Sequence, residues 1–422
     1  MKRLIFALTL FAFAFPLPAV TLTVEKVQQR YPWNGKVDID YTVTMETGDK
    51  PLGVDDVIEF TVVDLDAKPE ATYHPIVFEK GSPPMTGGRH RVTWMANADG
   101  LVFLSMNVRV GAAIRHYAPK WMVIDVSGGK SASVWPVEYL DGEPPNGFNA
   151  VEYKGDKIVL RYIHPGCFLA GSPTTEANRS ANEVQHPVAF VNGFYAGIFE
   201  MTQKQYYNIT GSDPSGYKGD YRPMERCSHS SIRGNTTWPN TGGTVTSTSP
   251  IGLLRAKAKA KDANGEYTVA VSGFDLPTEF QWEYACRAGT ATPYNNGVAC
   301  ANAGEQAVQL NLVGRNSNNK TDGKGGYSGN HTVVGSYLPN AWGLYDMHGN
   351  VCEWVLDSYR GDVENLKQYV EPVGPASTGW AIWRGGGVDW SSGACRSAWR
   401  SAPAASSNGN NACTGFRLFC AE

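Results

Sequence analysis

The sequence predicts two folded parts: an N-terminal all-β domain of the immunoglobulin-like sandwich class, followed by a larger, loop-rich α+β domain. Short runs in which apolar and polar side chains alternate fill residues 20–127, and this alternation is typical of half-buried strands. The chain contains 46 Gly and 25 Pro, which favours turns and short elements over long helices. The two convincing helix signals both lie beyond residue 200.

The N-terminus has the pattern of an export signal. Lys2 and Arg3 precede the apolar run 4–15, and the stretch 16–19 supplies a turn and a small residue for cleavage. We therefore expect residues 1–19 to be a signal peptide and the protein to be periplasmic, held at the cell surface or secreted. No later apolar run is long enough to cross a membrane.

Composition narrows the classes of partner. The net charge is −3, 18% of residues are charged and 42% are hydrophobic. A near-neutral chain without a basic block is not expected to bind nucleic acid. Its apolar content is that of a chain with packed cores rather than a disordered one.

The first domain reads as a spacer or docking module. Val37, Ile39, Tyr41 and Val43 alternate with polar residues, and similar runs predict six or seven strands within residues 20–127. This segment holds no Cys and no catalytic constellation, so a spacer or docking role is expected; attachment to an envelope, with the second domain used only for display, is one alternative. Residues 128–156 are rich in Gly, Ser, Pro and Asn and are predicted to be a linker.

Residues 157–422 form the second domain, with two predicted helices. Thr202 and Gln205 have the spacing of a capping box, and Gly211 marks the end of that segment. Thr278 and Gln281 repeat the pattern. The remainder reads as short strands and long loops, which need disulfides, metal ions or buried aromatic side chains to hold them.

All eight cysteines belong to this domain. An even number in an exported chain permits disulfides, although the sequence leaves the pairing open. We expect a disulfide between Cys413 and Cys420, which are close in sequence. Cys395 is flanked by arginines that would favour a thiolate, so it is a candidate reactive cysteine. The cysteines are Cys167, Cys227, Cys286, Cys300, Cys352, Cys395, Cys413 and Cys420.

Two further segments carry candidate sites. Asp346 and Glu353 lie seven residues apart around a Gly-Asn turn, an arrangement suited to calcium, although a capped turn with two solvated acids has the same pattern. The block 387–414 consists mostly of Ser, Ala, Gly and Asn and should form an exposed surface. Its candidate ligand-binding residues are Asp389, Trp390, Arg396, Trp399, Arg400 and Asn408.

Several motifs, in order along the chain, resemble those of the formylglycine-generating enzyme family, also called the sulfatase-modifying factor family. They are CFLAGS at 167–172, FEMTQ at 199–203, LPTEFQWEYA at 276–285, NAWGLYDMHGNV at 340–351, RGG at 384–386 and GFR at 415–417. The resemblance covers about 265 residues. It implies a fold similar to a large C-type lectin, with little regular secondary structure and with bound calcium.

The resemblance also implies specific sites. Its calcium ligands fall on the side chains of Asp346 and Glu353 and on the backbone carbonyls of Gly349 and Val351. Family members that oxidise a sulfatase cysteine bind copper(I) through two cysteines after the Arg-Gly-Gly motif.

The copper pair is incomplete in this sequence. Cys395 matches the second family cysteine, Trp390 stands at the first, and Gly387 replaces the usual serine. Copper(I) requires two thiolates, so copper is not expected, and Cys395 is catalytic only if the protein is an oxidase.

These observations predict an exported, non-catalytic, calcium-stabilised protein that binds or displays a ligand through the 387–414 surface. The ligand would be a protein, a peptide or a glycan. One alternative is a formylglycine-generating oxidoreductase that acts on a sulfatase cysteine. Another is a variable binding protein diversified by a retroelement, with hypervariable residues in the same block.

Overall fold

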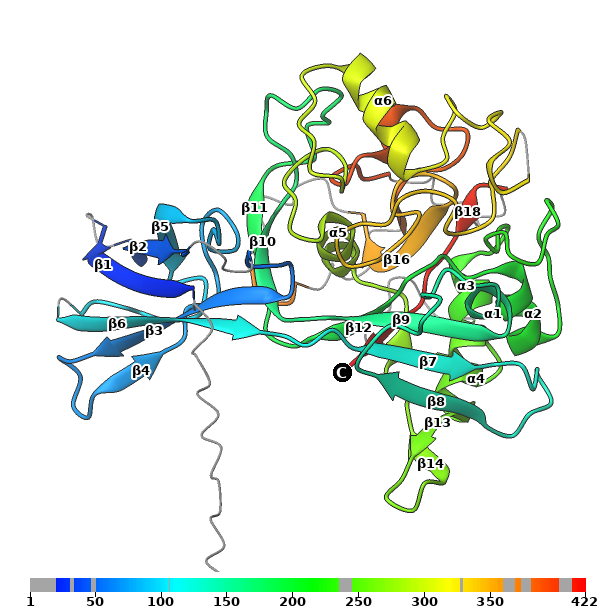
Figure 1. Ribbon diagram of the computed structural model, residues 1–422, viewed down its shortest axis with the longest axis horizontal. Helices are drawn as coiled ribbons and strands as arrows, with labels where there is room; N and C mark the ends of the chain where they lie inside the picture. The colour runs from blue at the N-terminus through cyan, green and yellow to red at the C-terminus, as the bar shows by residue number, and fades with distance from the viewer. Residues whose placement is uncertain are drawn as a thin grey trace, which may run out of the picture.

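The computed structural model describes residues 20–30, 34–46, 51–105, 107–234, 245–326, 329–359, 369–372, 381–401 and 412–422. The predicted signal peptide lies outside these ranges. Within them, no helix combines the length and the apolar character needed to cross a membrane. Figure 1 shows the N-terminal strands on one side and the larger, loop-rich part on the other.

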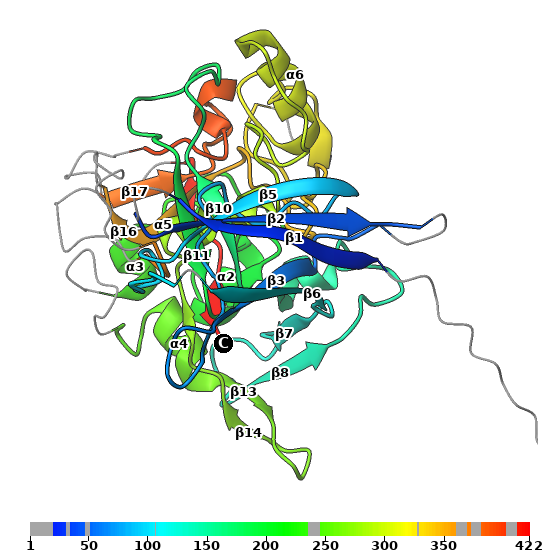
Figure 2. The same cartoon turned by 90° about the vertical axis from the view of Figure 1, so that its left-hand side faces the viewer.

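The N-terminal part consists of two antiparallel three-stranded sheets that pack face to face. One has the order β1-β2-β5 and the other β4-β3-β6, and Figure 2 shows them as two layers. Alternate residues of β2 point into the shared core, where the ring of Tyr41 lies 5.3 Å from that of Phe60. The strands are β1 (Thr21–Gln29), β2 (Lys36–Thr44), β3 (Asp56–Asp64), β4 (Ala71–Tyr73), β5 (Gly88–Met95) and β6 (Val108–His116).

This arrangement is a β-sandwich, and its alternating strands agree with the sequence pattern. Its immunoglobulin-like class stays a prediction.

The larger part is built on an eight-stranded sheet with the order β14-β13-β8-β7-β9-β12-β19-β15. The two outermost strands, β14 and β15, are separated in the chain only by residues 271–273. The sheet must therefore curl so that its two edges approach each other. Its strands are β7 (Trp121–Asp125), β8 (Trp135–Leu140), β9 (Lys157–Ile163), β12 (Phe194–Gly197), β13 (Ala258–Lys261), β14 (Tyr267–Ala270), β15 (Phe274–Asp275) and β19 (Phe419–Ala421).

Two smaller sheets and short helices complete this part. β10 (Gly166–Ala170) pairs with β11 (His186–Phe190), and β16 (Cys352–Ser358) lies between β17 (Ala381–Arg384) and β18 (Thr414–Gly415). The helices are α1 (Glu152–Gly155), α2 (Gln203–Thr210), α3 (His229–Arg233), α4 (Pro250–Lys257), α5 (Glu279–Arg287) and α6 (Ala303–Val313), with 3-10 turns at η1 (Lys324–Gly326) and η3 (Ser392–Cys395).

Both predicted capping boxes are confirmed. The Thr202 hydroxyl accepts a hydrogen bond from the Gln205 N–H at the start of α2, and Gly211 ends that helix with a φ of 76°. Thr278 and Gln281 make the same reciprocal pair at α5. Each box satisfies two backbone N–H groups that would otherwise lack partners, so the helix starts are set locally.

Residues 128–156 are not the expected linker. They contain β8 and α1 and bury Trp135, Phe148 and Tyr153. β7, which was expected to belong to the sandwich, pairs instead with β8 and β9 in the curled sheet. The Gly- and Ser-rich stretch is the turn of the β7–β8 hairpin, which explains why its composition resembles that of a linker.

The two parts are in direct contact. Arg161 of β9 donates to Asp55, with an Nη2–Oδ1 distance of 2.8 Å. The indole N–H of Trp342 donates to the carbonyl oxygen of Val54 at 3.2 Å, and His164 lies 2.7 Å from the same oxygen. These contacts between buried groups fix the sandwich to the larger part.

The cysteine prediction is wrong in one respect. All eight cysteines are free thiols in the structure, and the expected Cys413–Cys420 disulfide is not formed. Cys420 lies on β19, between β12 and β15, whereas Cys413 lies beside Asp389, with a sulfur–oxygen distance of 3.6 Å. Closeness in sequence did not bring the two side chains together, because β18 and the following turn separate them.

The buried position of Trp135 gives a test of the β7–β8 hairpin. We expect Trp135→Ala to lower the free energy of unfolding by about 3–5 kcal/mol, because it opens a cavity beneath the curled sheet. Ser133→Ala, at an exposed position two residues earlier, should change it by less than about 0.5 kcal/mol. Urea unfolding measures both, and equal small effects would restore the linker interpretation.

Candidate functional site

The block after Arg384 forms a surface with two tryptophans at its centre. We call Lys320, Asp389, Trp390, Trp399 and Cys413 the tryptophan surface. The rings of Trp390 and Trp399 meet edge to face, with centroids 4.8 Å apart, and both side chains are partly exposed. Exposed Asp389 accepts a hydrogen bond from the Lys320 ammonium at 2.8 Å. The surface therefore combines aromatic area with an exposed ion pair.

A tight turn at Gly386 connects this surface to strand β17 beneath it. Gly386 has a φ of 71°, and a Cβ built there would lie 2.6 Å from the carbonyl oxygen of Ala394 and 2.6 Å from the sulfur of Cys395. Only glycine allows the chain to pass so close to η3. The turn carries the chain from β17 to Trp390, whose ring also packs 6.3 Å from that of Trp383.

Two arginines predicted to contact ligand are buried instead. The guanidinium of Arg396 is fully buried and donates to both carboxylate oxygens of Glu183 at 2.7 Å, and to Glu176 at 2.6 Å. Arg400 is paired with Glu279 in the same way. Both arginines form structural ion pairs and do not belong to the tryptophan surface. Asn408 lies outside the described residues.

Cys395 is not a thiolate. Its side chain is fully buried against Tyr294, Leu310 and Val313, and this burial raises its pKa to about 12. The expectation that neighbouring arginines activate this thiol is wrong, because Arg396 is held by its own carboxylate partners.

The turn 346–353 lies below this surface and is part of a buried cluster of carboxylates. Asp346 and Asn350 adopt left-handed backbone angles, with φ of 56° and 59°. One oxygen of Asp346 accepts the Gly335 N–H at 2.7 Å, while its buried Oδ1 has no hydrogen-bond partner. Glu200 accepts from the Val351 N–H at 3.0 Å and from the Asn350 side chain at 2.6 Å.

Glu353 is held by a buried arginine. Arg417 donates to its two oxygens at 2.7 and 2.8 Å, and the Trp282 indole N–H donates at 2.8 Å. Asp346, Glu200 and Glu353 together carry one more charge than Arg417 and Lys154 can balance. Burial raises the pKa of Asp346 to about 6 and that of Glu200 well above its ordinary value. A proton or a cation must therefore neutralise the excess.

The cluster fits the calcium that the resemblance implies. The unpartnered Asp346 oxygen suits a hard cation. The three N–H groups around Glu353 leave about one of its four lone-pair sites available. In the described part of the chain no three His, Cys, Asp or Glu side chains form a metal-binding group. The predicted site needs only two such side chains, because Gly349 and Val351 would contribute carbonyl oxygens.

Two residues of this cluster were not assigned a role from the sequence. Glu200 and Arg417 stand in motifs that the resemblance used, FEMTQ and GFR, but neither was assigned to a site. Glu200 is fully buried where β12 leads into α2, and Arg417 is fully buried just before β19. The only signal in the sequence was that Glu200 is a single acidic residue in an apolar run, next to the capping box at Thr202.

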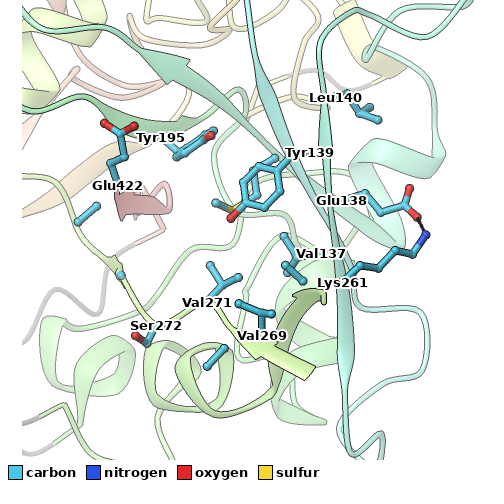
Figure 3. Close-up of a pocket in the computed structure, with 15 residues that line it drawn as sticks. Val137, Glu138, Tyr139, Leu140, Tyr195, Lys261, Val269, Val271, Ser272 and Glu422 are labelled. Atoms are coloured by element: carbon cyan, nitrogen blue, oxygen red, sulfur yellow. Dashed lines mark hydrogen bonds and ion pairs between the residues drawn. The ribbon is translucent and has the colours of Figure 1, made fainter. Parts of the chain in front are cut away.

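A separate cavity of about 940 Å³ lies at the mouth of the curled sheet. Figure 3 shows Tyr139, Tyr195 and Val271 at this cavity, and the ion pair between Glu138 and Lys261 at its side. No residue of the tryptophan surface lines it. This cavity is therefore separate from the tryptophan surface.

The fold and these sites define a loop-rich domain of the sulfatase-modifying class. The family model described as "Sulfatase-modifying factor enzyme 1-like domain" matches residues 150–421. The match covers more than half of the sequence, so the chain belongs to this family, and the family prediction is confirmed.

Relatives of differing function share the domain. The "Chaperone protein LppX" of Paenibacillus barcinonensis is 31% identical over 223 residues, which are 47% of this chain and 70% of LppX. The formylglycine-generating enzyme of Thermomonospora curvata is 30% identical over 129 residues, 27% of this chain and 38% of the enzyme. The chain thus spans less than half of that enzyme.

Similar solved structures are distant. PvdO from Pseudomonas aeruginosa has a TM-score of 0.46 at 21% identity and covers 63% of this chain and 94% of its own. Treponema denticola variable protein 1 has a TM-score of 0.45 at 22% identity and covers 63% and 96%. At this level of similarity neither supports an argument about ligand or mechanism.

The burial of Arg396 leads to a stability prediction. We expect Arg396→Ala to lower the free energy of unfolding by about 3–5 kcal/mol, because it leaves Glu183 buried without its partner. Lys320→Ala removes the exposed pair with Asp389 and should cost less than about 1 kcal/mol. Urea unfolding of both variants compares them directly. Equal costs would mean that Arg396 is accessible to solvent after all.

Proposed function

We propose that this chain is an exported, non-catalytic binding protein, and that its tryptophan surface contacts the ligand. The main support for the proposal comes from positions 390 and 395, where the resemblance places the two copper-binding cysteines of an oxidase. There Trp390 is partly exposed and packs edge to face on Trp399, while Cys395 lies buried beneath.

Copper-dependent oxidation lacks support from these residues. Copper(I) requires two soft thiolates. The indole of Trp390 supplies no such ligand, and the Cys395 thiol has a pKa raised to about 12 by burial. An indole that packs edge to face against a second indole instead provides a large apolar area with a polar N–H, which is typical of binding anchors.

The composition of the surface indicates a polymeric ligand. Two indole rings offer flat contact area, and the exposed Lys320–Asp389 pair offers one donor and one acceptor beside them. Protein, peptide and glycan ligands all match such a surface. The relative LppX is named as a chaperone protein, so a peptide segment of a protein is the class of ligand to test first. The N-terminal sandwich would then serve as the docking module.

Calcium would hold the turn beneath this surface. Its ligands would be the side chains of Asp346 and Glu353 and the carbonyl oxygens of Gly349 and Val351. Calcium would supply the positive charge that the buried carboxylates lack. Among this chain's own residues, Arg417 orients Glu353, and the Val351 N–H together with the Asn350 side chain orients Glu200.

Binding and oxidation can be tested on the same preparation. We expect peptides of an immobilised library to bind the full-length chain. Trp390→Ala and Trp399→Ala should each lower the affinity for those peptides at least about tenfold, as is typical of hot-spot anchors. Tyr207→Ala, which removes an aromatic ring exposed on α2, is the matched control and should bind normally.

The second arm measures oxygen uptake by the copper(I)-treated chain with a sulfatase-motif cysteine peptide. We expect none. Peptide-dependent uptake that Cys395→Ser abolishes would replace the binding proposal with an oxidase. If no peptide binds, a glycan array tests the remaining class, and failure of both would reject a ligand at this surface.

The calcium proposal predicts linked effects of pH and calcium. The pKa of Asp346 is raised to about 6 in the folded chain. The folded protein therefore loses stability as pH rises toward that value and the carboxyl group ionises. Without calcium, the free energy of unfolding should therefore rise by on the order of 1 kcal/mol between about pH 7.5 and pH 5.5, relative to Asp346→Asn. At pH 7.5, calcium should raise the Tm of the wild type but not of this variant.

The comparison with Asp346→Asn is needed because buried His229 and His348 act with the opposite sign. Burial lowers the pKa of each histidine, so their protonation destabilises the folded protein as pH falls. Asp141→Asn, at an exposed position, is the matched control and should keep the calcium response. Calcium that stabilises all three proteins equally would place the ion elsewhere.

A further inference from the structure

Three cysteine thiols lie around the glycines after Arg384, and no disulfide joins them. A Cβ built at Gly387 would lie 3.3 Å from the Cβ of Cys413 and 3.5 Å from the sulfur of Cys352. Both side chains thus reach the same small space, which exists because residue 387 has no side chain. Cys395 contacts Gly386, accepts a hydrogen bond from the backbone of Gly387, and is otherwise surrounded by Tyr294 and the apolar residues of α6.

The backbones of the pair are also in contact. The Cys352 N–H donates to the Cys413 carbonyl oxygen at 2.6 Å, where β16 runs parallel to β18. In the strand register Cys352 lies opposite Thr414, so Cys413 is one residue away from the paired position. Strands about 4.8 Å apart with a rise of about 3.3 Å per residue place such diagonal Cα atoms about 6 Å apart, which is within the Cα separation of about 4.4–6.8 Å that a disulfide spans. The strand pairing therefore brings the two backbones within the range of a disulfide, and both side chains approach the same glycine, Gly387.

The two thiols differ in access. Cys352 is fully buried, whereas Cys413 is partly exposed on the tryptophan surface. An oxidant can reach Cys413 first, and Cys352 lies behind it as the second thiol. We propose that Cys352 and Cys413 are an oxidisable pair, and that a disulfide between them fastens the tryptophan surface to β16.

The reaction balances with a small-molecule disulfide, such as oxidised glutathione, as the oxidant. The Cys413 thiolate attacks one sulfur of the oxidant, which forms a mixed disulfide and releases one glutathione thiolate. The Cys352 thiolate then attacks the Cys413 sulfur and releases the second. Two S–H bonds are replaced by one S–S bond in the protein, and the two protons and two electrons leave on two molecules of glutathione.

The surroundings favour a stable fastening over a catalytic exchange centre. Burial and the neighbouring Asp389 carboxylate raise the pKa of Cys413 to about 12, so its thiolate is scarce at neutral pH and exchange is slow. Closure would draw the Cys413 sulfur from Asp389 and leave that carboxylate to Lys320. The disulfide would thereby adjust the ion pair beside Trp390.

Peptide mapping tests the pairing directly, because trypsin places each of the eight cysteines on its own peptide. The folded, reduced full chain is incubated with oxidised glutathione, alkylated and digested. We expect peptide 325–360, which carries Cys352, to be joined to peptide 401–417, which carries Cys413. The oxidised chain should also unfold at a higher urea concentration than the reduced chain.

Cys413→Ser should abolish both the cross-link and the gain in stability. Cys300→Ser is the matched control, since Cys300 is the other partly exposed cysteine, and it should keep both. Circular dichroism establishes that each variant is folded. Joining of peptide 325–360 to 385–396, joining of 401–417 to 418–422, or no cross-link in the folded chain would each overturn the proposal.

Discussion

Buried pairs of arginine and carboxylate hold the loop-rich domain together. Arg384 is fully buried and donates to Glu283 at 2.6 Å and to the carbonyl oxygens of Ser397 and Trp399 at 2.8 and 2.6 Å. Arg315 donates in the same way to carbonyl oxygens of its own loop. A guanidinium has five N–H donors in one plane, so one side chain can satisfy several loop carbonyls that no strand or helix would pair.

This constraint also decides what the surface can be. Arg396 and Arg400, which the sequence suggested as ligand-binding residues, are paired with carboxylates instead, and those carboxylates are buried with them. Among the described residues of this block and its neighbours, the tryptophan surface is left with two indoles, one exposed ion pair and one thiol. The surface is therefore better suited to contact through aromatic area than to capture of an anion.

The same framework explains the excess charge below the surface. Arg417 neutralises Glu353, but Asp346 and Glu200 share too few cations in a fully buried space. Such an imbalance is expensive in a protein interior unless a proton or a metal ion relieves it. The calcium proposal and the pH dependence predicted for Asp346 thus have one physical origin.

The sequence by itself determined the features whose partners are a few residues apart. The alternation along β2, the capping boxes at Thr202 and Thr278 and the turn at 346–353 follow from local periodicity and local hydrogen bonds. The family motifs were also readable, because they are contiguous in the chain.

Only the tertiary structure decided the rest. Arg396 finds Glu183 at a separation of 213 residues, and β7 leaves the sandwich because its partner strand, β9, lies beyond the apparent linker. Cys413 lies near Cys352 rather than Cys420, because β18 pairs with β16 and sets Thr414, the residue after Cys413, opposite Cys352. Burial depends on which distant segments cover a residue, and burial set both the pKa values and the roles of these side chains.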